Sequence, residues 1–112
     1  FVSAIHRVLE GHRRSLVVVT PDLRLRQVDE AKPLHVQTWD LRGLSALATS
    51  RGLMQIRHRM SNQPLPMDHW PWLDFQLTRH GDDDVRLHVN FSNLFLDQFS
   101  GLRLLSEIEQ CY

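Results

Sequence analysis

The sequence has very little cysteine, no long apolar run and no excess charge of either sign. Cys111 is the only thiol, so the chain cannot form an internal disulfide, and we expect a reducing, cytoplasmic setting. No segment approaches the roughly 18 apolar residues of a membrane span. Thirteen basic residues balance thirteen acidic ones, so no global field attracts polyanions. We therefore expect neither nucleic acid nor a membrane as a partner.

What remains is the composition of one folded domain. The chain has 112 residues, of which 42% are hydrophobic, and this is enough for one core and no more. We therefore treat residues 1–112 as a single domain. We expect it to be partial, because the sequence opens within a helical pattern and lacks an initiator Met. Seven histidines are many for this length, but no two stand at a metal-ligand spacing, so we expect no metal.

Apolar residues at helical spacing predict three helices, over residues 1–12, 43–61 and 99–112. Gly11 ends the first pattern, as glycine often does at a helix C-terminus. Gly52 is a weak point within the second. The apolar stripes are Phe1, Ile5, Val8 and Leu9 in the first helix, Leu44, Leu47, Leu53, Ile56 and Met60 in the second, and Leu102, Leu105, Ile108 and Tyr112 in the third.

Alternating and β-branched segments predict strands at 15–20, 24–28, 34–40, 72–80 and 85–91. The last two are joined by the polar turn "GDDD" and give the strongest hairpin signal in the chain. The residues expected to face the core are Leu73, Phe75, Leu77, Val85, Leu87, Val89 and Phe91 in this hairpin, and Leu34, Val36 and Thr38 in 34–40. The order of the elements argues for an α/β or α+β fold.

A short polar turn at 92–100 joins the last strand to the last helix. Asp97 and Ser100 flank the start of that helix. An Asp or Ser there commonly accepts hydrogen bonds from free backbone N–H groups, so we favour a capping role for at least one of them. A functional interpretation of the turn needs more context, and a resemblance supplies it.

Four segments, in order, resemble the condensation and heterocyclization domains of nonribosomal peptide synthetases. The first is "FVSAIHRVLEGHRRSLVVVTPD", similar to the family's helix, "RHxxLR" segment, strand and "PDG" turn. "WDLRG" resembles its "DLR" segment, and "MSNQPLPMDHWPWLDFQLT" the stretch with "WPxFD" that typifies heterocyclization members. "RLHVNFSNLFLDQFSGLRLLSEIEQCY" is similar to its strand, core motif and helix. The resemblance implies an α/β lobe, the N-terminal half of a two-lobed fold like chloramphenicol acetyltransferase, with a mixed or antiparallel sheet and about three helices.

The core motif of the heterocyclization branch is DxxxxDxxS, and this chain matches it in part. Asp97 falls on the second Asp and Ser100 on the Ser, but Ser92 stands where the first Asp belongs. In condensation members the segment is HHxxxDG, and Asn93 stands at its second His. Asn has no protonation change near neutrality and cannot act as a general base. The catalytic residues are therefore unknown.

Two further segments depart from the family pattern. "RHxxLR" keeps His12 but loses its Leu-Arg pair, and Leu23 stands where "PDG" has Gly. Leu at that position predicts a different turn geometry. We expect such departures from the family pattern in a lobe that no longer takes part in catalysis.

The resemblance implies a function that needs more than this chain. The family joins a carrier-bound acyl group to a carrier-bound Cys, Ser or Thr and cyclises the product to a thiazoline or oxazoline, often in siderophore biosynthesis. It binds no cofactor directly, because phosphopantetheine arrives on carrier proteins. Asp97 would order the motif loop, Ser100 would cap the helix and border the substrate tunnel, and His88 and Asn90 are candidates to face that tunnel. The second lobe is absent here, so the chain alone should not catalyse.

Several alternatives stay open at this point. The chain can instead be a degenerate, non-catalytic lobe that serves as scaffold, linker or dimerisation element. Expected partners are carrier proteins, neighbouring synthetase domains and, as a candidate, a second copy of the chain. The basic side of the middle helix (Arg51, Arg57 and Arg59) is either a solvated face or a surface for an acidic carrier protein. Asp82, Asp83 and Asp84 fit a solvated turn better than a metal site.

Overall fold

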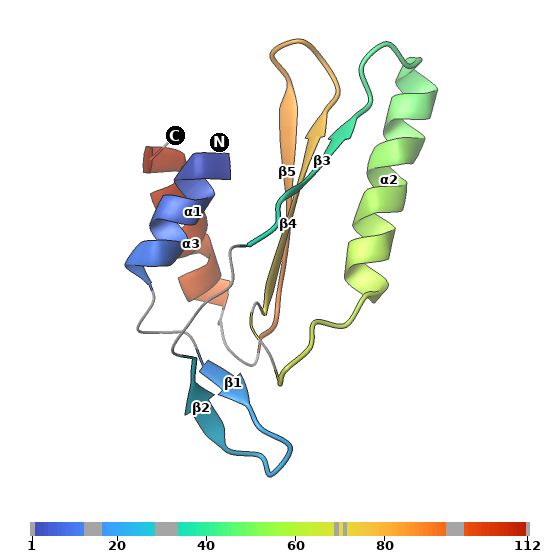
Figure 1. Ribbon diagram of the computed structural model, residues 1–112. Coiled ribbons are helices and arrows are strands. Elements are labelled where there is room, and N and C mark those ends of the chain that lie inside the picture. The colour runs from blue at the N-terminus through green and yellow to red at the C-terminus, as the bar shows by residue number, and fades with distance from the viewer. Residues whose placement is uncertain are drawn as a thin grey trace. The chain divides into compact units, whose positions relative to one another are not determined.

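Residues 2–12, 17–28, 34–68, 70, 72–93 and 98–111 are described by a computed structural model. Within them lie α1 (Val2–Gly11), β1 (Val17–Val19), β2 (Leu25–Gln27), β3 (Gln37–Asp40), α2 (Ala46–Asn62), β4 (Leu73–Arg79), β5 (Val85–Phe91) and α3 (Gln98–Cys111). The strands form an antiparallel pair, β1–β2, and a sheet in the order β3–β4–β5, in which β3 runs parallel to β4 (Figure 1). The predicted α/β fold is confirmed. No helix in these residues is long and apolar enough to cross a bilayer.

Contacts within the chain divide it into two compact units. The first comprises 1–34, 65–73 and 91–112 and holds α1, β1, β2 and α3. The second comprises 35–64 and 74–90 and holds β3, α2 and nearly all of β4 and β5. The residues of the core motif therefore belong to the first unit, and the polar residues of the hairpin to the second.

In the first unit α1 packs against α3 (Figure 1). The buried side of α1 is the predicted one, with Ile5, Val8 and Leu9 in the core, whereas Phe1 lies outside the described residues. The buried side of α3 differs from the prediction. Ile108 is buried as predicted, but Leu102 is 60% exposed, and Gly101 and Leu104 are buried beside Ile108 instead.

Gly101 explains why the buried side of α3 is rotated. A Cβ atom at this position would lie 2.9 Å from Cζ of Phe91, so the glycine lets α3 approach the ring at the end of β5. Apolar spacing could not reveal this, because glycine carries no side chain to count as apolar.

In the second unit β4 is the central strand and is buried on both faces. Phe75 on one face and Thr78 on the other are both 0% exposed. The sequence predicted only one buried face, with Gln76 and Thr78 on a polar one. The second face is buried because α2 lies along it, and the amide of Asn90 donates to the carbonyl of Met60 in the last turn of α2 at 2.9 Å.

Helix α2 begins later than predicted and buries less of its apolar stripe. Ser45 is the N-cap, with its hydroxyl accepting from the N–H of Ala48 at 3.2 Å, while Gly43, at φ +78°, belongs to the preceding turn. Ile56 and Met60 are buried as predicted. Leu44 and Leu47 are 50% and 63% exposed, so the start of the helix is not covered.

For strands β3 and β5, the prediction of which side chains face the core is wrong in part. Strand β3 begins only at Gln37, so the alternation from Leu34 does not continue through it; Thr38 is exposed and Trp39 is half-buried instead. The indole N–H of Trp39 donates to Oε1 of Gln76 at 2.8 Å across the parallel pair, which fixes this orientation. Val85, at the start of the edge strand β5, is 51% exposed.

The turn before β2 keeps a conformation that favours glycine. Leu23 has φ +60°, in the left-handed region, although Leu in place of Gly predicted a different geometry. The turn is held by neighbouring bonds, including N–H of Leu23 to the carbonyl of Thr20 at 2.9 Å. Leu23 is 84% exposed, so no packing of its side chain offsets the strained backbone.

Candidate functional site

The core motif lies between the end of β5 and the start of α3. Ser92 is half-buried, and its backbone N–H donates to the carbonyl of Trp72 at 3.2 Å, whereas Asn93 is exposed. Asp97 lies outside the described residues. Ser100 is exposed and is the third residue of α3, so it is not the N-cap that the sequence predicted.

Gly101 brings the two ends of this motif together. It follows Ser100 in α3, and its contact with the ring of Phe91 places the first turn of the helix over the residue before Ser92. Ser92 is the neighbour of Phe91 in the chain and Ser100 the neighbour of Gly101, so this glycine–aromatic contact holds both motif residues near it.

The two tunnel candidates, His88 and Asn90, point from β5 toward α2. Nε2 of His88 lies 3.1 Å from Oγ1 of Thr78 across the hairpin, and Asn90 bonds to the carbonyl of Met60. This bond satisfies one of the last carbonyls of α2, which have no partner within the helix. A small cavity of about 250 Å³ is lined by both residues together with Arg57, Met60, Ser61 and Val89. Their part in a tunnel stays a prediction.

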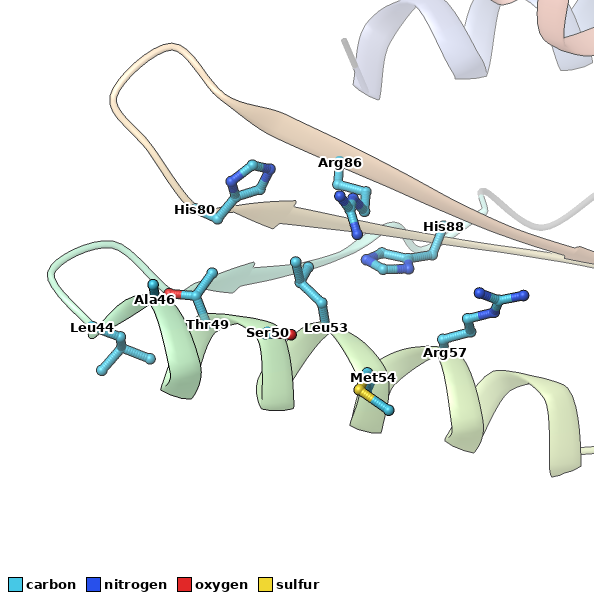
Figure 2. A pocket seen from close by; sticks show the side chains of 10 residues that line it. All are labelled: Leu44, Ala46, Thr49, Ser50, Leu53, Met54, Arg57, His80, Arg86 and His88. Carbon is cyan, nitrogen blue, oxygen red and sulfur yellow. The ribbon is translucent and has the colours of Figure 1, made fainter.

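A larger groove of about 760 Å³ runs between α2 and the hairpin (Figure 2). Thr49, Leu53 and Arg57 point from the helix toward the strands, and Arg86 and His88 point from the strands toward the helix. None of the described residues that line this groove is acidic. They are Leu44, Ala46, Thr49, Ser50, Leu53, Met54, Arg57, His80, Arg86 and His88. Basic side chains therefore stand on both walls, Arg57 on the helix and Arg86 on the strands, and the helix wall also carries apolar and hydroxyl groups.

Among the residues that line the groove, His88 has a pKa that is clearly shifted by its surroundings. Partial burial lowers the pKa of His88, and the nearby positive charge of Arg86 lowers it further. Both effects disfavour the imidazolium. At neutral pH the ring is thus a neutral hydrogen-bonding partner of Thr78.

The segment that resembles "DLR" forms a tight local ion pair. Nη2 and Nε of Arg42 donate to Asp40 at 2.6 and 2.9 Å, and the backbone N–H of Arg42 donates to the same carboxylate at 3.1 Å. These bonds hold the pKa of Asp40 well below its usual range. Because the charges of Asp40 and Arg42 pair with each other within the turn, this motif positions the start of α2 and presents no unpaired charge to a ligand.

Sequence reasoning missed most of the groove. It named His88 and the basic helix side but did not connect them with Arg86, His80 or Thr49. The signal was present, because Arg86, His88 and Asn90 alternate along one face of β5. What the sequence could not supply was that α2 covers this polar face. Within the described residues, no three Asp, Glu, His or Cys side chains gather as a metal site.

Neither a protein-family model nor a curated protein sequence matches the chain. Solved structures are similar in fold. The cyclization-docking bidomain of the nonribosomal peptide synthetase EpoB from Sorangium cellulosum matches 96% of this chain with a TM-score of 0.80 and 18% identity, over 22% of its own length. SgcC5 from Streptomyces globisporus matches 99% with a TM-score of 0.80 and 17% identity, over 26% of its length. The nonribosomal peptide synthetase FmoA3 matches 99% with a TM-score of 0.67 and 18% identity, over 12% of its length.

At this level of identity the comparisons establish the fold. The chain has the fold of part of a nonribosomal peptide synthetase condensation-type domain, and the resemblance inferred from its motifs is confirmed to that extent. It spans only part of the length of these three structures, 22%, 26% and 12% respectively.

Proposed function

We propose that the chain is part of a condensation-type domain that acts on acyl groups carried as thioesters on carrier proteins. The observation that carries the proposal is the match of 96% of the chain to the EpoB cyclization-docking bidomain, at a TM-score of 0.80. The core-motif segment supports it, since Ser92 directly follows β5 and Ser100 lies in the first turn of α3. The substrates would arrive on phosphopantetheine, so the domain itself would hold no cofactor.

Within this class we place the chain in the heterocyclization branch. "WPWLDF" and "LDQFS" resemble that branch, and the EpoB structure is described as a cyclization domain. The reaction would form a peptide bond to Cys, Ser or Thr and close a thiazoline or oxazoline ring with loss of water, in a product such as a siderophore. Carrier proteins and adjacent synthetase domains would be the partners.

A second candidate function is a non-catalytic scaffold lobe. The observation that favours it is the pair Ser92 and Asn93, which supplies neither the first Asp of one motif nor the second His of the other. Neither side chain can take up or release a proton near neutrality. A lobe without these groups could still position carrier proteins or neighbouring domains.

Restoring the missing carboxylate distinguishes the two functions. The variant is Ser92→Asp in the longest natural protein that contains the chain, assayed by mass spectrometry for the ring-closed product. An impaired catalyst should gain ring formation, because a carboxylate can order the loop by charged hydrogen bonds. Ser106→Asp, at an exposed site on α3, is the control for added charge. No gain over that control, in a protein whose activity maps to another domain, would favour the scaffold.

A further inference from the structure

The groove between α2 and the hairpin concentrates positive charge that the described part of the chain does not neutralise. Arg57 lies on the helix wall and Arg86 on the strand wall. Within the described residues neither makes an ion pair, whereas Arg24, Arg42 and Arg103 each pair with a nearby carboxylate. Like charges held in one groove without a counter-charge repel each other, which favours an anion between them.

The surrounding groups fit a tetrahedral anion. His88 adds a ring nitrogen beside Arg86 on the strand wall, while Thr49, Ser50 and His80 line the groove nearer the start of α2. A carboxylate is planar and pairs best with a single guanidinium fork. A phosphate has acceptor oxygens in several directions, so it can bridge donors that come from opposite walls.

The remaining lining indicates a ligand with an apolar part. Leu44, Ala46, Leu53 and Met54 line the groove beside the charged groups. Its volume of about 760 Å³ falls within the usual range for small-molecule sites. The chain has no net charge at pH 7, so it lacks the field that draws in a nucleic acid. The groove thus favours a small amphipathic anion over a polyanion.

We infer that this groove binds a small phosphate ester, with the phosphate between Arg57 and Arg86 and the apolar part against Leu53. The inference does not depend on the proposed function, because it concerns side chains of α2 and the hairpin and not the core motif.

Phenyl phosphate is the probe that tests the site, with phenol as its uncharged counterpart. Titrated into the full 112-residue chain, phenyl phosphate should shift the amide resonances of Thr49, Leu53 and His88, and phenol should shift them far less. Binding should also raise the pKa of His88, since a bound anion stabilises the imidazolium. Inorganic phosphate should bind at the same residues more weakly, because it lacks the apolar part.

Three variants decide whether the effect belongs to this site. Arg57→Gln and Arg86→Gln should each weaken binding by about tenfold or more, as expected for the loss of one charged hydrogen-bonding group. Arg51→Gln, exposed on the same helix but outside the groove, should leave the affinity unchanged. Both groove arginines are exposed, so their replacement removes no core side chain. Equal weakening by Arg51→Gln, or a pKa of His88 that does not rise with ligand, would overturn the inference.

Discussion

Two single residues show how backbone conformation departs from sequence preference in this chain. Leu23 adopts a positive φ that suits glycine, and Gly43 adopts one without cost. Leu23 is 84% exposed, and a Cβ on Gly43 would meet nothing within 4 Å, so a substitution at either site changes little besides backbone freedom. These positions form a matched pair with opposite expected effects.

We expect Leu23→Gly to stabilise the chain by about 0.5–1 kcal/mol. The left-handed conformation costs a side-chain-bearing residue about 1–2 kcal/mol, and part of the relief is offset by the greater freedom of glycine in the unfolded state. Gly43→Ala should destabilise by about 1 kcal/mol for the converse reason. Urea denaturation measures both free energies of unfolding. Effects of the same sign for the two variants would contradict the assignment of positive φ.

The elements show how far periodicity alone predicts this fold. Alternation correctly predicted β4 and β5, and helical spacing predicted all three helices, because each has several apolar residues in phase. Periodicity failed to predict which side chains are buried where contacts with a neighbouring element decide it. Trp39 turns inward because Gln76 accepts its N–H, and the second face of β4 is buried because α2 covers it.

The candidate site was predictable only in its local part. Ser92 and Ser100 belong to one linear motif, so the sequence could place both near the junction of β5 and α3, although Ser100 lies inside α3 and not at its N-cap. The groove joins residues of α2 to residues more than twenty positions away in β5, and no linear pattern links such positions. Its basic character emerges only when Arg57 and Arg86 are seen on facing walls (Figure 2).

Two helical glycines test whether close packing or helix propensity governs α2 and α3. A Cβ at Gly101 would lie 2.9 and 3.2 Å from atoms of the Phe91 ring, and one at Gly52 would lie 2.9 Å from a terminal methyl of Leu41. Alanine gains about 1 kcal/mol of helix propensity over glycine at either position. An aromatic ring cannot yield as a leucine methyl can, and overpacking costs about 1–3 kcal/mol.

We therefore expect Gly101→Ala to destabilise the chain by about 1 kcal/mol and Gly52→Ala to leave its stability nearly unchanged. Thermal or urea unfolding of both variants, compared with the parent chain, gives the difference directly. A gain in stability of similar size at both sites would mean that α3 does not approach Phe91 as closely as the structure places it.

The chain as a whole should lose stability on acidification in two stages, and the first of them falls on the second unit. The pKa of His88 in the second unit is lowered by burial and by Arg86, so the unfolded chain binds a proton there more readily than the folded one. Stability is therefore lost as pH falls below about 6.5, the ordinary pKa of histidine. The pKa of Glu107 in the first unit is lowered chiefly by its hydrogen bond with His12 at 2.7 Å. The stability due to this carboxylate is kept above about pH 4 and lost below it.

Hydrogen exchange followed by mass spectrometry can separate these stages. Between about pH 6.5 and 5 we expect protection, corrected for intrinsic rates, to fall in peptides of α2 and β5 while those of α1 and α3 keep theirs. His88→Gln should abolish this first stage, because glutamine does not titrate and can still hydrogen-bond to Thr78. Glu107→Gln should leave the first stage intact and remove only the loss in the first unit below about pH 4. A first stage that persists in His88→Gln, or that appears equally in α1 and α3, would show that another group controls the acid response.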